Sequence, residues 1–211
     1  MLHVEAFWAS PWVCATYATL REKCIPFTTA TSMVRKGAGA IDTLLERTLT
    51  GMAPVLQHGN LWLAESSAIV EYLEEMFPEP RMLPAAPHDR ARARQLMAWL
   101  RSDASYLALT RDRPSEHIFY PPPQRTPLSE AGQRFADRLI TVMTRLGADP
   151  SGALFGGRFG VVDVDLAFAL MRLVTGDVPV PDPIAAYARA VWSRPLVRDF
   201  VEHQRPPHRP F

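Results

Sequence analysis

The sequence predicts a mixed α/β domain followed by an all-helical domain. In the first 80 residues, short apolar runs bounded by Gly and Pro alternate with helical patterns in the order β-α-β-α-β-β-α, which is typical of a small sheet covered by helices. A proline-rich stretch follows, and beyond it apolar residues recur at helical spacing. We therefore expect domains at residues 1–80 and 88–211, joined by a linker at 81–87.

Composition and charge argue against several classes of function. The chain has 211 residues, of which 47% are hydrophobic and 21% are charged, enough for a sizeable core. A net charge of +1 gives no basic stripe for nucleic acid, and the apolar runs are too short to span a membrane. The chain opens on a strand pattern rather than a leader, so we expect a cytoplasmic location.

The first helix is predicted to begin at a Ser-Pro pair. Residues 2–7 alternate as a strand does, and Ser10-Pro11 then breaks the pattern. Serine is a favoured N-cap and proline fits the first helical position, so we expect a helix from Pro11 to about residue 23. Both cysteines are expected in this region, with Cys24 facing the core. Cys14 and Cys24 would lie about 15 Å apart along the helix, which is too far for a disulfide.

A second strand, a hairpin and another helix complete the first domain. Residues 26–31 are rich in β-formers, and a Gly-containing loop with a weak helix at 41–48 follows. Apolar runs at 53–57 and 61–64 flank a His-Gly-Asn turn, a pattern typical of an antiparallel hairpin. Glu65-Ser66-Ser67 is expected to cap the last helix, which ends before two prolines.

The second domain is predicted from apolar residues at helical spacing. One segment is apolar nearly all round, as expected for a helix at a domain centre. The predicted helices cover residues 88–111, 128–146, 161–174, 182–192 and 195–203, with an irregular proline-rich stretch at 114–127.

Three short motifs, in this order, resemble the glutathione transferase superfamily across essentially the whole chain. They are Ser10-Pro11-Trp12-Val13, Met52-Ala53-Pro54-Val55-Leu56 and Glu65-Ser66-Ser67-Ala68-Ile69. The motifs are most similar to serine-type classes and their bacterial homologues. The resemblance implies a thioredoxin-like first domain, glutathione as co-substrate and no metal. It also implies a homodimer that joins the first domain of one subunit to the second domain of the other.

Ser10 is the residue on which the predicted chemistry depends. Glutathione reacts as a thiolate, yet an ordinary thiol with a pKa of about 8.5 is mostly protonated at neutral pH. A hydroxyl donor at the positive end of a helix stabilises the thiolate. The alternative is that Ser10 only caps the helix. The two roles are compatible, because a capping oxygen leaves the hydroxyl proton free to donate.

The second motif is expected to bind the middle of the tripeptide. An X-Pro bond is usually trans, but in the family the bond before the proline that matches Pro54 is cis. The backbone of Ala53 then pairs with the cysteinyl part of glutathione. Met52 stands where many members have lysine or glutamine, which removes a polar side chain. Lys36, or the neighbouring Arg35, is the candidate partner of the glycyl carboxylate.

Glu65 and Ser66 also make physical sense as a site without the resemblance. A helix N-terminus presents unpaired N–H groups and about half a positive charge, which suits a carboxylate. We expect Ser66 and its N–H to hold the γ-glutamyl carboxylate and Glu65 to pair with the ammonium group. The structural alternative is a serine N-cap beside a solvated glutamate.

The acceptor substrate is less defined by the sequence. The family's acceptor site implies Trp12, Trp99 and Tyr106 as candidate walls between the domains, unless these residues are ordinary core. A small hydrophobic electrophile is the expected acceptor, and an organic hydroperoxide is an alternative. Two other functions stay open: a non-catalytic glutathione-binding or protein-interaction module on the same fold, and thiol-disulfide exchange through Cys14.

In the helical domain, a Gly160 to Asp163 segment resembles the family's buried capping box. Glycine replaces the usual capping hydroxyl, so only half of the box remains. Asp163 is expected to accept the Gly160 N–H, with Phe159 and Val164 as a hydrophobic staple. We predict a structural role for Asp163 and no chemistry.

Overall fold

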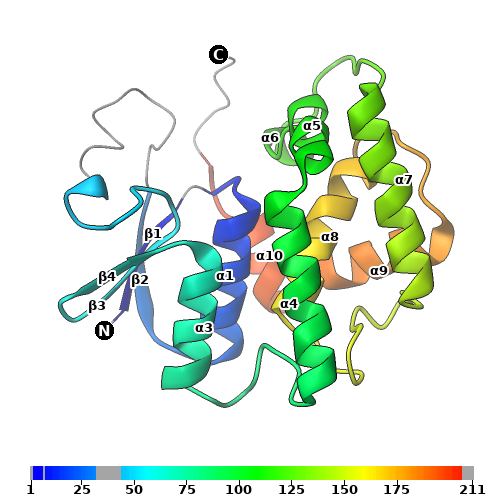
Figure 1. The fold of residues 1–211 in the computed structure, drawn as a ribbon. Helices are drawn as coiled ribbons and strands as arrows, with labels where there is room; N and C mark the ends of the chain where they lie inside the picture. Colours follow the sequence, from blue (N-terminus) through cyan, green and yellow to red (C-terminus); the bar gives the residue numbers. More distant parts are fainter. Residues whose placement is uncertain (1, 7, 32–43, 206–211) are drawn as a thin grey trace. The chain divides into compact units, whose positions relative to one another are not determined.

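The computed structural model describes residues 2–6, 8–31 and 44–205 of the chain (Figure 1). The chain divides into two compact units, Met1–Met82 and Leu83–Phe211, and the division falls within the segment 81–87. Within the described ranges, no helix combines the length and apolar character needed to cross a membrane.

The first unit is a four-stranded mixed sheet with helices, in the thioredoxin-like arrangement that was expected. Its strands lie in the order β2-β1-β3-β4; β1 pairs parallel with β2, and the other two pairs are antiparallel. Of the predicted weak helix at 41–48, the first three residues lie outside the described residues, and Leu44 and Leu45 form a short helical turn. The elements are β1 (Leu2–Ala6), α1 (Pro11–Glu22), β2 (Phe27–Thr31), β3 (Val55–His58), β4 (Leu61–Ala64) and α3 (Ser66–Met76).

The sheet and the helices α1 and α3 enclose the core of this unit. The two helices pack side by side (Figure 1). Strand β1 buries Leu2 and Val4 and leaves His3 between them partly exposed, as the alternation predicts. The helices contribute apolar side chains that are at most 1% exposed, namely Val13, Leu20, Ile69, Val70 and Leu73.

Helix α1 ends one residue earlier than predicted, and Cys24 does not face the core. Cys24 adopts a positive φ of 53° and is exposed. The N–H of Ile25 binds the Leu20 carbonyl at 3.0 Å, and the N–H of Cys24 binds the Arg21 carbonyl at 3.0 Å. This is a Schellman ending, in which the left-handed residue turns the chain and the apolar pair joined by the first of these bonds, Leu20 and Ile25, is buried. The prediction of an inward Cys24 was therefore wrong, because the helix had already ended.

The second unit is all-helical, as expected. Helix α8 lies at its centre, with its side chains from the first residue to Leu173 buried. The helices are α4 (Pro87–Ser102), α5 (Ala104–Asp112), α6 (Glu116–Phe119), α7 (Glu130–Arg145), α8 (Val161–Val174), α9 (Asp182–Trp192) and α10 (Pro195–Val201). The short α6 lies in the stretch 114–127 that was predicted to be irregular.

The single helix predicted at 88–111 is wrong, because the chain breaks at Asp103. This residue is extended, with φ −78° and ψ 117°, and serves as the N-cap of α5. Its carboxylate accepts the N–H groups of Ser105 at 2.8 Å and Tyr106 at 3.4 Å. Leu107, one of the residues used to extend the pattern, is 53% exposed. Because aspartate is a favoured N-cap, the break places the Asp103 carboxylate where it accepts the first N–H groups of α5.

Candidate functional site

The three predicted motifs lie at one end of the sheet. Val55, the first residue of β3, pairs with Glu5 of β1 and with Ala64 of β4. Pro54 directly precedes β3 and Glu65 directly follows β4. Ala6 is the last residue of β1 at this same end, and the turn that follows it leads to Ser10. We call this end of the strands the Ala6 end of the sheet; the helices α1 and α3 both begin there (Figure 1).

Ser10 is the N-cap of α1, as the sequence predicts. Its backbone is extended, with φ −83° and ψ 130°, and Pro11 occupies the first helical position. The Ser10 hydroxyl oxygen accepts the Val13 N–H at 3.5 Å, which is the outer limit of a hydrogen bond. The side chain is partly exposed. The structure thus confirms the cap, and its hydroxyl proton is not used by that contact.

The Ala53–Pro54 peptide bond is cis, as the resemblance implies. Pro54 is buried, Ala53 is partly exposed and Met52 is 48% exposed. The segment before them is held by Thr48, whose hydroxyl oxygen accepts the Gly51 N–H at 2.9 Å. Lys36 and Arg35, the candidates for the glycyl carboxylate, lie outside the described residues.

Glu65 occupies the N-cap position of α3 in an unusual backbone conformation. Its φ is +69° and its ψ is 107°, a region that non-glycine residues rarely adopt and that costs about 1–3 kcal/mol. The side chain is exposed, and it does not cap the helix. Ser66 is the first helical residue rather than the N-cap and is 5% exposed. The N-terminus of α3 therefore presents its first N–H groups without a side-chain cap from residue 65.

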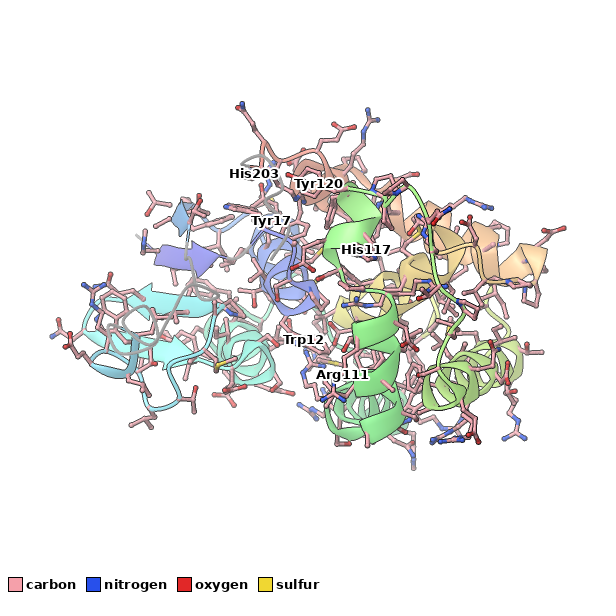
Figure 2. All side chains as sticks on the ribbon, turned by 90° about the horizontal axis from the view of Figure 1, so that it is seen from above. Trp12, Tyr17, Arg111, His117, Tyr120 and His203 are labelled. Carbon is pink, nitrogen blue, oxygen red and sulfur yellow. The ribbon has the colours of Figure 1, made fainter. Side chains whose placement is uncertain are left out.

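Sequence reasoning missed two residues at this end, Trp8 and Thr31. Trp8 lies in the turn after β1, is 5% exposed, and donates its indole N–H to the Thr31 hydroxyl at 3.2 Å. Its ring lies edge-on to that of Tyr17 on α1, with centroids 5.6 Å apart. Figure 2 shows Tyr17 and Trp12 on the same helix. In the sequence, the one feature that could have indicated Trp8 is that it is an aromatic residue just before the Ser-Pro pair.

The candidate acceptor residues belong to different units. Trp12 is partly exposed on α1. In the helical unit, Trp99 donates its indole N–H to Asp103 at 2.8 Å, and its ring centroid lies 5.0 Å from that of Phe135. Tyr106 is 4% exposed, with its ring 4.9 Å from that of Phe135. Packing within the helical unit accounts for both rings, which favours the ordinary-core alternative for Trp99 and Tyr106.

Burial and electrostatics limit the other chemistry at this end. Cys14 is 0% exposed in α1, and reactive cysteines are usually accessible and in electropositive surroundings. Across the described ranges, no group of three or more His, Cys, Asp or Glu side chains gathers that could hold a metal ion. The two helix N-termini each contribute about half a positive charge, so the Ala6 end favours an anionic ligand.

Comparisons with known proteins agree with this arrangement. Residues 9–76 match the glutathione S-transferase N-terminal domain, and residues 87–204 match the glutathione S-transferase C-terminal domain. A crystal structure of a glutathione transferase homolog from Burkholderia, with bound glutathione, is 34% identical, has a TM-score of 0.74, and is covered over 95% of both chains.

Two curated relatives match shorter segments. Glutathione S-transferase U17 of Arabidopsis thaliana is 32% identical over 97 residues, which are 44% of this chain and 41% of that protein. A stringent starvation protein A homolog of Coxiella burnetii is 43% identical over 56 residues, 26% of this chain and 27% of that protein. The chain thus aligns with less than half the length of these relatives. Since the two domain matches together cover most of the sequence, the chain belongs to the glutathione S-transferase family.

Proposed function

We propose that this protein is a glutathione transferase that activates the glutathione thiol for attack on a small hydrophobic electrophile. The observation that supports it most is the convergence of Ser10, the Ala53–Pro54 bond and Glu65 at the Ala6 end of the sheet. Each lies at or beside the start of a helix or strand, where backbone groups are available to a ligand.

Ser10 performs the central step in this proposal. The thiol of bound glutathione loses its proton to solvent, and the Ser10 hydroxyl donates a hydrogen bond to the thiolate. The same oxygen accepts the Val13 N–H at the start of α1, so the positive helix end adds to the stabilisation. The sulfur then forms a bond to the electrophilic carbon, and the leaving group departs with the bonding electron pair.

The rest of the tripeptide is assigned along the same end. Ser66 and the first N–H groups of α3 bind the γ-glutamyl carboxylate, and Glu65 pairs with the ammonium group. The backbone of Ala53 pairs with the cysteinyl residue, and Lys36 with the glycyl carboxylate. The exposed side chain of Glu65 leaves its carboxylate accessible to such a ligand.

Acceptor and assembly are the finer parts of the proposal. Trp12, two residues after Ser10, is the proposed wall for an aromatic or alkyl electrophile. An organic hydroperoxide is the second acceptor class, reduced to an alcohol and water while two glutathione thiols form one disulfide.

A homodimer would bury apolar side chains that the first unit leaves exposed, among them Leu45 at 47% and Leu49 at 100%.

A non-catalytic module is the second candidate. The match to a stringent starvation protein A homolog, a relative whose name is not that of a transferase, favours keeping it. The contact between Ser10 and Val13 is also what a purely capping serine would make. On this alternative the protein keeps the fold, with or without the tripeptide site, and any trace activity is unchanged in Ser10→Ala.

The test is isothermal titration of the protein with glutathione, repeated on Glu65→Ala. Glu75→Ala is the matched control, because it removes an exposed carboxylate from the other end of α3. We expect saturable binding by the wild type and the control, and roughly tenfold weaker binding by Glu65→Ala, as for loss of one charge-assisted hydrogen bond. Absence of both heat and a thermal shift at millimolar glutathione would exclude the transferase and the glutathione-binding form of the module; binding without turnover of chlorodinitrobenzene or cumene hydroperoxide would favour the module.

A further inference from the structure

Trp8 ties the turn between β1 and α1 to the neighbouring strand. Its indole N–H donates to the hydroxyl of Thr31 at 3.2 Å. Thr31 is the last residue of β2 and pairs with Ala6, the last residue of β1. The bond therefore crosses from the turn to the edge strand at the end of the sheet where the site is proposed.

The ring of Trp8 is also fixed by α1. It meets Tyr17 edge-on, at 5.6 Å and 73°, and Tyr17 in turn meets Phe27 at 5.4 Å and 83°. Edge-on aromatic pairs of this kind contribute beyond the area that they bury. Trp8 is thus held by the helix on one side and by the strand on the other, and the turn cannot shift without breaking one of these contacts.

The Ser10 hydroxyl needs such support, because its own helix holds it weakly. The distance from the Ser10 oxygen to the Val13 nitrogen is 3.5 Å. At the start of α7, the equivalent bond from Gly132 to the Ser129 oxygen is 3.1 Å. A hydrogen bond at 3.5 Å constrains the rotation of a side chain less than one at 3.1 Å. The hydroxyl therefore depends more on where the turn, anchored two residues earlier at Trp8, places the Ser10 Cα and Cβ.

We propose that Trp8, through its hydrogen bond to Thr31, is a positioning residue that holds the Ser10 hydroxyl against the glutathione sulfur. This rests on the proposed function. A group that stabilises a reacting atom must be held within about 0.5 Å of its productive position, and residues that do not touch the substrate usually provide that constraint. In this role Trp8 and Thr31 make no contact with glutathione and exchange no proton with it.

The decisive variant is Thr31→Val, which keeps the shape of an exposed strand residue and removes the hydroxyl that accepts the Trp8 N–H. Thr31→Ser restores a hydroxyl at the same place. Thr28→Val is the matched control: Thr28 lies on the same strand, and its hydroxyl bonds His3 of β1 at 2.8 Å, towards the other end of the sheet. Trp8→Phe removes the indole N–H and keeps an aromatic ring for Tyr17.

We expect Thr31→Val to lower kcat/KM at neutral pH roughly three- to tenfold, the effect of one hydrogen bond. The pH at which the rate is half-maximal should rise by about 0.5–1 unit, because the thiolate is less stabilised. The KM for glutathione should stay unchanged. Trp8→Phe should show the same shift, and Thr31→Ser and Thr28→Val should have the profile of the wild type.

A purely structural role predicts a different result. A folded Thr31→Val that loses activity equally at all pH values, or not at all, would overturn the proposal, as would an equal shift in Thr28→Val. In either case a wild type that binds and turns over glutathione leaves the proposed function standing. A wild type that neither binds glutathione nor shows thiolate absorbance with it removes the proposed function and this inference together.

Discussion

At the start of helix α8, a side chain of the helix itself hydrogen-bonds the backbone around the N-cap. Asp163 accepts the Gly160 N–H at 2.8 Å, the Leu154 N–H at 3.0 Å and the Tyr187 hydroxyl at 2.7 Å. Phe159 before the cap and Val164 after it are both buried, as the expected hydrophobic staple requires. Both carboxylate oxygens of Asp163 thus have partners from the protein, and Asp163 itself is 1% exposed.

Helix α3 begins in the opposite way. Its N-cap residue, Glu65, has a positive φ and an exposed side chain that makes no capping bond. This helix start carries backbone strain, and the Glu65 side chain does not bind its first N–H groups. It is therefore less stable than a capped start with an unstrained backbone. On the proposed function, the uncapped start of α3 serves a ligand, whereas the capped start of α8 serves stability. The following predictions test this difference.

The largest effect is expected from Asp163→Ala. The change leaves the buried Gly160 N–H, the partly buried Leu154 N–H and the buried Tyr187 hydroxyl without their acceptor, so the free energy of unfolding should fall by about 3–5 kcal/mol. Urea denaturation measures it. The folded fraction should bind glutathione with unchanged affinity, because the residues proposed to bind the tripeptide lie in the other unit.

Asp182→Ala is the control for this variant. Asp182 is also an acidic residue in the first turn of a helix of the second unit, but it is exposed. Its removal should change the unfolding free energy by no more than about 0.5–1 kcal/mol. If the two variants lose similar stability, α8 does not depend on the hydrogen bonds of Asp163, and the proposed contrast between the starts of α8 and α3 is wrong for α8.

The protonation of Asp163 gives a second measurement at α8. Burial raises the pKa of its carboxyl to about 6, against the lowering effect of its hydrogen bonds from Tyr187, Gly160 and Leu154. The folded state therefore holds a proton that the unfolded state has released between pH 4 and 6, and stability should decrease as the pH rises through this range.

Asp163→Asn isolates that contribution. The difference in unfolding free energy between wild type and Asp163→Asn should change by roughly 2–3 kcal/mol across the window, with the wild type relatively more stable at the acidic side. Other titrating groups cancel in the difference. A pH-independent difference would show that Asp163 stays ionised in the folded protein, its three donors outweighing burial.

Helix α1 lies between the two cases, and Ser10→Asp separates its two roles. Aspartate is as good an N-cap as serine, but its carboxylate cannot donate to a thiolate and repels it. We expect the unfolding temperature to be nearly unchanged and kcat/KM to fall about tenfold to a hundredfold, the size of a charge-assisted hydrogen bond. Ser10→Ala should lose both activity and about 1 kcal/mol of stability. Full activity in Ser10→Asp would leave Ser10 as a cap alone.

These helix starts also show what the sequence could predict. The α8 start and both its bounds followed from a segment after glycine that is apolar nearly all round, and Ser10-Pro11 defined the α1 start. At α3, Ser66 is the better capping residue by type, so nothing local indicated that Glu65 would take the N-cap position with a positive φ. Backbone strain is maintained by the surrounding fold, which local propensity does not describe.

Two further differences come from contacts between distant positions. Asp103 breaks the helix expected at 88–111 while its carboxylate also accepts the Trp99 indole and pairs with Arg138 of α7. The hydrogen bond from Trp8 to Thr31 joins positions 23 residues apart. Neither contact leaves a periodic pattern, so the order of elements was predictable, whereas the break and the anchor of the turn were not.

The smallest effect in stability, and the sharpest test of α3, is the comparison of Glu65→Gly with Glu65→Ala. Both remove the carboxylate and should weaken glutathione binding equally, by roughly tenfold. They differ in the backbone, because glycine adopts a φ of +69° without steric cost and alanine does not. We therefore expect Glu65→Gly to be about 1 kcal/mol more stable than Glu65→Ala in urea denaturation.

The same pair of substitutions at Glu71, inside α3, should give the opposite order. There the backbone is helical, and glycine costs about 1 kcal/mol relative to alanine. An inversion of sign between positions 65 and 71 would show that the start of α3 carries strain that the rest of the helix does not. If glycine is the less stable substitution at both positions, Glu65 is not strained, and the contrast with α8 reduces to the absence of a cap.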